Sequence, residues 1–272
     1  AVAALLARGL RPELAETRGP GDAEVIAREA AGRGVRTVVA AGGDGTIAEV
    51  AAGLAGGGGA ALGLLPLGTA NVLAWELGVP RAPERAAAVL AAGRVEMLWP
   101  GVARFADGHT RLFVQMLGAG FDAAVVAELD LEWKRRVGRL AYVAGSLREL
   151  ARYRFPVIEA ELDGVAATAA SVIVSKGRLY AGRYVLAPGA RPAEPGFRVV
   201  LFRRGGALRA ALAGAALPLG LVRRLPGVEI VPASRVVLRA AAPVPVQADG
   251  DPAGGLPVWV ADAARPLRVV LP

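Results

Sequence analysis

Three glycines surround a single carboxylate at Gly42-Gly43-Asp44-Gly45, and Thr46 follows directly. Glycines let a ligand approach the main chain, and the helical pattern that begins here would offer unpaired N–H groups to a phosphate. A bare carboxylate repels phosphate, so Asp44 fits this position if a Mg²⁺ ion or a proton in transfer lies between the two. The residue types therefore predict phosphate chemistry.

A buried strand must lead into this loop, and a helix must leave it. Residues 35–41 are apolar with β-branched side chains, and residues 46–54 have a helical pattern. Strand and helix patterns go on alternating up to residue 92, which predicts a three-layer α/β domain with a parallel sheet. Ligands on such sheets bind beyond the carboxyl ends of the strands, where Asp44 and Thr69 lie.

Two details of the N-terminal part are expected from local patterns. Residues 11–17 resemble a short strand, and Asp22 is the expected N-cap of a helix over residues 23–34. Near residue 95 the pattern changes to short strands separated by turns, with Asp163-Gly164 as a hairpin signal.

An antiparallel β-sandwich is the economical architecture for the second part. We expect the α/β nucleotide-binding domain to cover residues 1–98 and the β-sandwich domain residues 99–272, including a strand over residues 267–271. One long helical region, residues 123–153, interrupts the strands.

Composition narrows the function. The chain has 272 residues, 54% of them hydrophobic, a net charge of +8 and no cysteine, and its pI is about 10.8. Disorder and disulfides are therefore excluded, and the basic surface suits nucleic acid, an anionic membrane or a polyphosphate substrate. No zinc-finger or RNP-like pattern is present, so nucleic acid is not expected. The single histidine, His109, lies in a predicted hairpin turn, where we expect it to be solvated.

Two apolar stretches bear on membrane contact. Residues 50–75 are uncharged, but glycines and Pro66 interrupt them, so they do not predict a membrane span. Residues 208–225 are apolar with arginines at their ends and would suit a membrane surface, although Pro218 and several glycines favour a buried domain helix. We expect a cytoplasmic protein, with peripheral contact at the inner membrane face left open.

Five blocks in order resemble the diacylglycerol kinase catalytic-domain superfamily, and within it the bacterial YegS-type lipid kinases. They are GGDGT at 42–46, LPLGTANVLA at 65–74, GAGFDA at 118–123, KRRVGRLAY at 134–142 and ADGDP at 248–252. Because five blocks occur in the right order over nearly the whole chain, chance is a poor explanation. The alternative is a nucleotide-binding α/β protein of another family. The family opens with a strand and an Asn-Pro-x-Ser-Gly loop, and this sequence, as a fragment or as a divergent member, lacks both.

The resemblance implies ATP and Mg²⁺ as cofactors and a set of residues around the nucleotide. That set comprises Thr17, Gly42, Gly43, Asp44, Gly45, Thr46, Glu49, Thr69, Asn71 and Arg135. Neither lysine follows a Walker-type loop, so the helix that contains Arg135 would supply positive charge over the phosphates. A solvated basic helix face is an equally good interpretation of that helix.

The resemblance also implies the acidic groups of catalysis. Asp251 would accept the proton of the acceptor hydroxyl, with Asp249 orienting it or binding metal through water, and Asp44 takes the base role in the related sphingosine kinases. The implied metal ligands are Asp44, Asp249 and Glu194. Glu194 lies in the loop that carries a second, structural Mg²⁺ in the family. A proline occupies the expected aspartate position there, so we predict that this second site is weakened or lost.

Three functions remain open. An ATP-dependent kinase of a diacylglycerol-like lipid at the membrane surface is the expected one. A kinase of a polar metabolite, as in NAD kinases, and a catalytically inactive nucleotide- or lipid-binding module are the alternatives. A lipid at the membrane surface is thus the expected partner, and a homodimer is left open.

Overall fold

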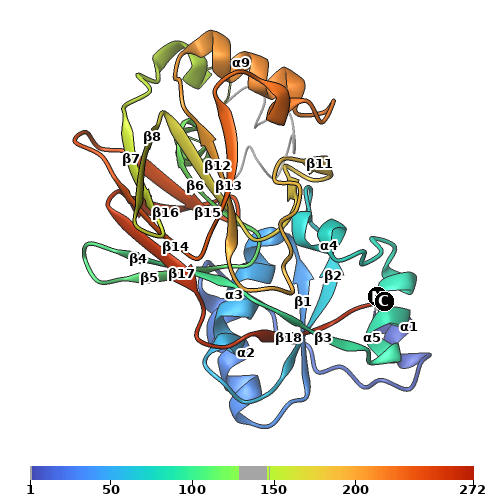
Figure 1. The fold of residues 1–272 in the computed structure, drawn as a ribbon. Helices are drawn as coiled ribbons and strands as arrows, with labels where there is room; N and C mark the ends of the chain where they lie inside the picture. Colours follow the sequence, from blue (N-terminus) through green and yellow to red (C-terminus); the bar gives the residue numbers. More distant parts are fainter. Residues whose placement is uncertain (1, 129–145, 147) are drawn as a thin grey trace.

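The computed structural model describes residues 2–128, 146 and 148–272, which form two domains (Figure 1). The N-terminal sheet has four strands: β1 (Thr37–Gly42), β2 (Ala61–Pro66), β18 (Leu267–Val270) and β3 (Val95–Leu98), in that order. Strands β1, β2 and β18 are parallel, and β3 runs antiparallel to β18.

Strand β18 corrects one prediction, which assigns residues 267–271 to the sandwich. The chain instead returns to the first domain at its C-terminal end. Leu267 and Val269 pack on one side of the sheet and Val270 on the other, so this strand is buried on both faces like any inner strand of a three-layer domain.

Helices cover both faces of this sheet, as the predicted three-layer arrangement requires. The helices of the domain are α1 (Val2–Leu6), α2 (Asp22–Gly32), α3 (Asp44–Ala55), α4 (Val72–Glu76) and α5 (Pro83–Ala92). Ile47 of α3 packs with Leu62 on one face, whereas Leu90 of α5 packs with Leu65 on the other. Burial on both faces explains why β2 reads as an uninterrupted apolar run.

Two local predictions in this domain are wrong. Residues 10–18 contain no strand. Helix α2 begins at Asp22, and Gly21, with a φ of 89°, holds the N-cap position. The Asp22 carboxylate instead accepts hydrogen bonds from the preceding backbone N–H groups of Arg18 (2.7 Å) and Gly19 (3.0 Å). An aspartate before a helix satisfies backbone donors in either arrangement, so sequence does not distinguish them.

The second domain consists of two six-stranded antiparallel sheets, which confirms the predicted sandwich. The β9 sheet has the order β13-β12-β9-β6-β15-β16 and the β14 sheet the order β5-β4-β17-β14-β7-β8. The strands are β4 (Gly101–Phe105), β5 (Thr110–Phe113), β6 (Met116–Gly120), β7 (Ile158–Leu162), β8 (Val165–Ala169), β9 (Ser171–Ser175), β12 (Phe197–Phe202), β13 (Val228–Ala233), β14 (Arg235–Arg239), β15 (Pro245–Ala248), β16 (Asp251–Gly255) and β17 (Val258–Asp262), and β10 (Leu179–Tyr180) pairs with β11 (Tyr184–Val185) in a small ribbon.

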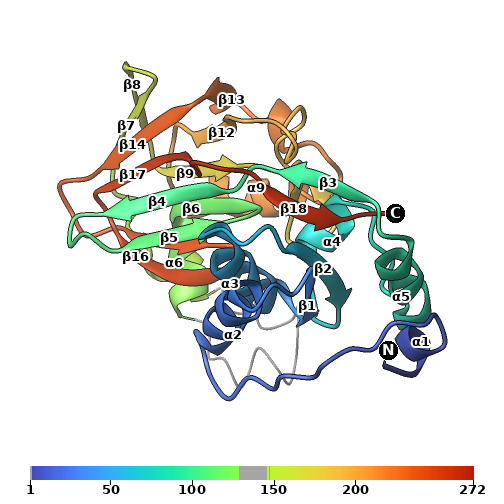
Figure 2. The same cartoon turned by 90° about the horizontal axis from the view of Figure 1, so that it is seen from below.

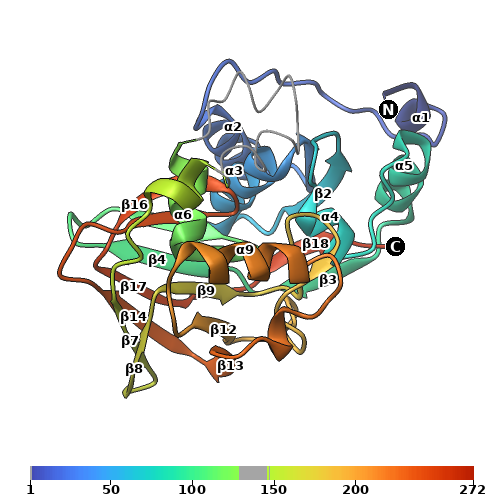
Figure 3. The ribbon, with the colours of Figure 1, turned by 90° about the horizontal axis from the view of Figure 1, so that it is seen from above.

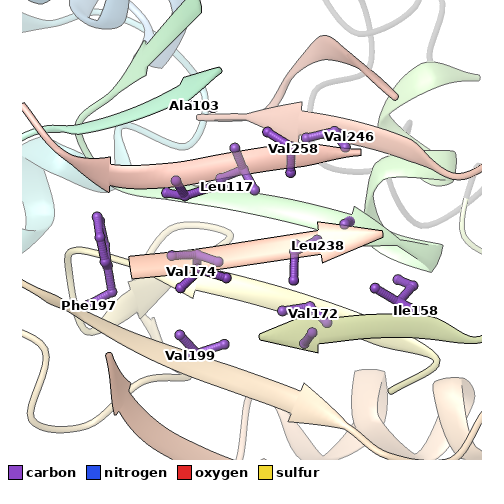
Figure 4. Close-up of a cluster of buried hydrophobic side chains, with 14 of the residues drawn as sticks. Ala103, Leu117, Ile158, Val172, Val174, Phe197, Val199, Leu238, Val246 and Val258 are labelled. Atoms are coloured by element: carbon purple, nitrogen blue, oxygen red, sulfur yellow. The ribbon is translucent and has the colours of Figure 1, made fainter. Parts of the chain in front are cut away.

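The core of the sandwich lies between the two sheets (Figure 4). Leu117 and Val174 of the β9 sheet meet Leu238 and Val258 of the β14 sheet. Strand β7 buries every second residue, as expected for a strand with one face in the core and one in solvent.

Strand β9 is buried on both faces, because helices cover the outer face of its sheet (Figure 3). These are α9 (Ala207–Ala216) and the 3₁₀-helix η1 (Val222–Arg224), whose Ala216 and Val222 pack against Ile173 and Val200. The predicted helix over residues 123–153 is observed at its two ends, as α6 (Phe121–Ala127) and a helical stretch at 148–152. Residues 129–145 and 147 lie outside the described part.

Helix α9 contradicts the expectation of a buried helix. Ala216 is its one buried residue, and Leu208, Leu212 and Leu219 are 74%, 51% and 70% exposed. Within the described ranges, no helix combines the length and apolar character that crossing a bilayer requires.

The chain passes between the domains twice, through adjacent segments (Figure 2). It leaves the N-terminal sheet after Leu98 and returns to it after Asp262. The backbone N–H of Ala263 donates to the carbonyl of Pro100 (2.9 Å), and that of Trp99 donates to the carbonyl of Pro192 (2.7 Å). Both connections are therefore fastened to the same end of the sandwich.

Candidate functional site

The glycine loop between β1 and α3 packs directly against the loop that follows β2. The N–H of Leu67 donates to the carbonyl of Gly42 (2.9 Å). A Cβ on Gly68 would lie 2.4 Å from the Cα of Gly43, so only glycine fits this approach. The first hydrogen bond of α3 runs from the N–H of Ile47 to the carbonyl of Gly43 (3.0 Å). The three N–H groups before it are at the positive end of a helix and suit a phosphate.

Two polar side chains fix these loops. Oδ1 of Asp44 accepts a hydrogen bond from the N–H of Val72 (2.6 Å), which joins the glycine loop to the start of α4. Asn71 is fully buried, and its amide accepts from the N–H of Gly68 (2.9 Å) and donates to the carbonyl of the same residue (2.6 Å). Asn71 therefore fastens the loop, and the neighbouring Thr69 is left exposed on it.

Asp251, at the start of β16, lies against the first turn of α3. A Cβ on Gly45 would be 2.7 Å from Oδ2 of Asp251, so any side chain at this position would have to displace the carboxylate. Gly45, which follows Asp44 in the chain, thus provides the space that the Asp251 carboxylate occupies. The two domains bring Asp44 and Asp251 to one place, as the sequence predicted.

Asp249 is a buried anchor for the turn that carries Asp251. Its Oδ2 accepts a hydrogen bond from the N–H of Val114 (2.7 Å), and its Oδ1 accepts from Gln115 (2.8 Å) and Met116 (2.9 Å). Burial raises the pKa of Asp249 to about 6, against the opposing effect of these three bonds, and the negative charge of Asp44 adds to the rise. With both oxygens engaged, Asp249 orients Asp251, and the predicted role as a metal ligand does not fit.

Three further residues hold the same turn and were not predicted as site residues. Oε1 of Gln247 accepts from the N–H of Gly250 (2.8 Å), and Nε2 of Gln247 donates to Oδ2 of Asp122 (2.8 Å). The Tyr180 hydroxyl donates to the other oxygen of Asp122. Burial raises the pKa of Asp122, and these two hydrogen bonds oppose the rise. The GAGFDA block pointed to Asp122, but no local pattern connects it to Tyr180 or Gln247.

A second contact joins the domains beside the site. Glu76 of α4 accepts hydrogen bonds from Nε of Arg178 and from the N–H of Leu179, both at 2.8 Å. The Glu76 side chain is only 2% exposed. A buried, doubly bonded carboxylate of this kind holds α4 against the β10–β11 ribbon.

Three other residues that were predicted to bind the nucleotide are not observed at the glycine loop. Glu49 is not part of the phosphate cradle: its carboxylate accepts from the N–H groups of Gly21 (2.9 Å) and Ala23 (3.2 Å) and caps α2. Thr17 is exposed in the irregular segment before α2, and Arg135 lies outside the described residues.

The predicted metal ligands need a similar correction. The Glu194 carboxylate is exposed and accepts from Nη1 of Arg191 (2.7 Å), so it contributes nothing to the site. Among the residues that the structure describes, no three acidic, histidine or cysteine side chains are arranged to hold a metal. Mg²⁺ needs only one or two carboxylates where phosphates and water supply the other ligands. Asp44 and Asp251, beside the cradle, fit that requirement.

His109 is exposed at the turn between β4 and β5, as predicted, and it also makes specific contacts there. Its ring stacks on Phe105 at 4.3 Å, and its Nε2 lies 3.1 Å from the carbonyl oxygen of Ala253. Hydrogen bonding to Asp107 raises the pKa of His109. The ring belongs to the packing of the β4–β5 hairpin.

Comparison with known proteins identifies the family of both domains. The model of the diacylglycerol kinase catalytic domain matches residues 1–99, and that of the YegS C-terminal NAD kinase beta sandwich-like domain matches residues 115–271. A relative from Xanthomonas euvesicatoria named "Probable lipid kinase YegS-like" is 40% identical over 157 residues, which are 56% of this chain and 50% of that protein. The chain spans 50% to 62% of the length of such curated relatives.

Two solved structures show the same fold at low sequence identity. A diacylglycerol kinase from Bacillus anthracis has a TM-score of 0.72 and 18% identity, with 100% of this chain and 90% of that chain covered. An NAD kinase from Archaeoglobus fulgidus, solved in complex with ATP, has a TM-score of 0.54 and 15% identity, with 99% and 87% covered. Because the sandwich model alone covers more than half of the chain, the protein belongs to the diacylglycerol kinase and YegS-like family.

Proposed function

We propose that the protein is a lipid kinase that transfers the γ-phosphoryl group of ATP to the hydroxyl of a diacylglycerol-like lipid. One observation carries the proposal. The carboxylate of Asp251, from the sandwich, lies against Gly45 in the first turn of α3, beside Asp44 and the glycine loop. The glycine loop of one domain and an acidic side chain of the other thus lie together, as transfer from a nucleotide to an acceptor requires.

Each part of the site has a role in such a transfer. The first-turn N–H groups of α3 and the loop at Thr69 would hold the phosphates. Asp44 and Asp251 would hold Mg²⁺, which neutralises charge on the phosphates when it is bound. Asp251 would also accept the proton of the lipid hydroxyl while that oxygen attacks the γ-phosphorus, the bond between the γ-phosphorus and the bridging oxygen breaks, and ADP leaves. Asp249 and Gln247 keep the Asp251 turn in position.

The test is phosphate transfer from radiolabelled ATP to diacylglycerol in anionic vesicles, with phosphatidic acid as the measured product. We expect Asp251→Asn to lower kcat by at least about 100-fold, because a positioned general base contributes at least that much. Asp107→Asn, which changes an exposed hairpin carboxylate, is the matched control and should keep full activity.

The other outcomes of this assay identify the alternatives. Phosphorylation of NAD in place of every lipid would identify a metabolite kinase. A rise in melting temperature with ATP, but without transfer to any acceptor, would identify a binding module. Either result would refute the proposal.

We also propose that the protein works at an anionic membrane surface, on the face formed by α9. Residues 203–228 contain five arginines and no acidic residue. Leu208, Leu212 and Leu219 protrude from the same segment. Exposed leucines among arginines suit the headgroup region of an anionic leaflet, where apolar side chains insert and the basic ones stay at the surface.

A further inference from the structure

Lys176 is a fully buried cation at the end of β9, away from the candidate catalytic site. Its side chain is 0% exposed. Its Nζ donates to the carbonyl oxygens of Glu194 (3.1 Å) and Gly196 (2.9 Å) and to Oδ1 of Asp262 (2.7 Å). A neutral amine has two N–H groups and an ammonium has three, so these three oxygen acceptors match the charged form.

The oxygens around Nζ come from two separate segments. Two are backbone carbonyls of the loop between β11 and β12, and the third belongs to a carboxylate at the end of β17. The other oxygen of Asp262 accepts from the N–H of Gly196 (2.6 Å), which closes the arrangement. Carbonyl and carboxylate oxygens are the ligands that hard metal cations take in proteins. The site therefore has a metal's ligands with an ammonium at their centre.

A structural Mg²⁺, which the family resemblance places in this loop, does not fit here. Pro195 has no donor atom in its side chain, and the Glu194 carboxylate points to Arg191 at the surface. A divalent cation beside the Lys176 ammonium would be strongly repelled in a buried position.

We infer that the Lys176 ammonium is the built-in cation of this loop, so that the loop needs no divalent metal, and that removing the ammonium opens a site for an added cation. The location gives the ammonium a specific task. The carbonyl of Pro192 in the same loop accepts the N–H of Trp99 (2.7 Å), at the first passage between the domains. Asp262 stands at the start of the second passage. Lys176 thus locks the sandwich end of both connections.

The same residue connects to the candidate catalytic site through the backbone. The N–H of Lys176 donates to the carbonyl of Gln115 (2.8 Å), and the N–H of Gln115 donates to Asp249 (2.8 Å). A disturbed loop at Lys176 would therefore reach the anchor of the Asp251 turn.

The experiment measures the thermal unfolding midpoint of the full chain with EDTA, MgCl₂ or methylammonium chloride. Every protein carries Asp44→Asn and no nucleotide is added, so that cations at the catalytic site do not contribute. We expect the Lys176 protein to have the same midpoint in all three solutions. Lys176→Ala, which leaves a cavity and buried oxygens without a partner, should lose on the order of 10 °C in EDTA and recover part of it with Mg²⁺ or methylammonium.

Two control variants locate the effect. Lys176→Met fills the space without a charge and should be destabilised without any response to cations. Lys176→Ala combined with Asp262→Asn should lose the response of the single variant.

Three results would overturn the inference. One is a midpoint of the Lys176 protein that rises with Mg²⁺ relative to EDTA, since that would show a resident metal. Another is a folded Lys176→Ala protein that no cation stabilises. The third is a Lys176→Ala chain that stays unfolded in all three solutions.

Discussion

At the scale of single residues, the contact between Asp251 and Gly45 determines whether the two halves of the site can meet. A Cβ at Gly45 would lie 2.7 Å from Oδ2 of Asp251, so even alanine must displace the carboxylate. The backbone of Gly45 is helical, and alanine is the better helix former. Function and stability should therefore respond in opposite directions to one methyl group.

We predict that Gly45→Ala lowers the rate of phosphoryl transfer by about 100-fold while the free energy of unfolding is unchanged or higher. Kinase assays and urea unfolding of the same preparation measure both quantities. Gly56→Ala is the control, because a Cβ there meets no atom within 4 Å. Full activity of Gly45→Ala would show that the position of Asp251 is not critical.

Asp249 gives a prediction on pH, because its pKa of about 6 is well above the ordinary 3.8. Between about pH 4 and pH 6 the folded protein binds this proton and the unfolded chain does not, so stability falls as the pH rises. Two pKa units correspond to ~3 kcal/mol. Urea unfolding across this range should show that fall in the wild type, and a correspondingly smaller one in Asp249→Asn. Identical pH profiles for the two proteins would contradict the assignment.

At the scale of elements, the sequence identified those whose signals are local. The glycine loop, the strand before it, the helix after it and the hairpin at Asp163-Gly164 are specified by residues adjacent in the chain. Glu49 was misassigned because its partners are the N–H groups of Gly21 and Ala23 at the start of another helix. Asp122 and Gln247, far apart in sequence, likewise give no local sign of their contact.

The burial of helix α9 also could not be predicted from local sequence. Its alanines and leucines look alike in a core helix and in one that rests on a surface, and Pro218 with the glycines in residues 208–225 favours the buried interpretation, which is wrong. Only the tertiary structure shows that one residue of the helix is buried.

We predict that Leu208→Ser together with Leu212→Ser weakens binding to anionic vesicles by about tenfold or more, since each inserted leucine contributes on the order of 1 kcal/mol or more. Cosedimentation with vesicles of phosphatidylglycerol measures the effect. Val157→Ser together with Val165→Ser removes two equally exposed apolar side chains elsewhere and should leave binding unchanged. Equal losses in both pairs would rule out a specific role for α9.

At the scale of the whole molecule, the α/β domain is completed by the last strand of the chain. Strand β18 pairs with both β2 and β3, and its side chains enter both cores of that domain. The sequence pattern predicted the strand but not its sheet, because a short, mainly apolar stretch with one arginine suits either domain.

We predict that a chain ending at Asp262 keeps a folded sandwich but loses the cooperative unfolding of residues 2–98. Limited proteolysis should then cut within those residues, because β2 and β3 lose their shared neighbour. Removing Pro272 alone is the control and should cause no new cleavage. Protection of residues 2–98 in the shorter chain would show that β18 is dispensable.

The two adjacent connections between the domains, after Leu98 and after Asp262, have a mechanical consequence. Because both covalent links leave through one corner, side by side and antiparallel, we expect any relative motion of the two domains to hinge there. Such a motion would have to open the contact of Glu76 with Arg178 and Leu179. Admitting a substrate and closing over it would then follow a single angular coordinate, along which Asp251 approaches and recedes from the start of α3.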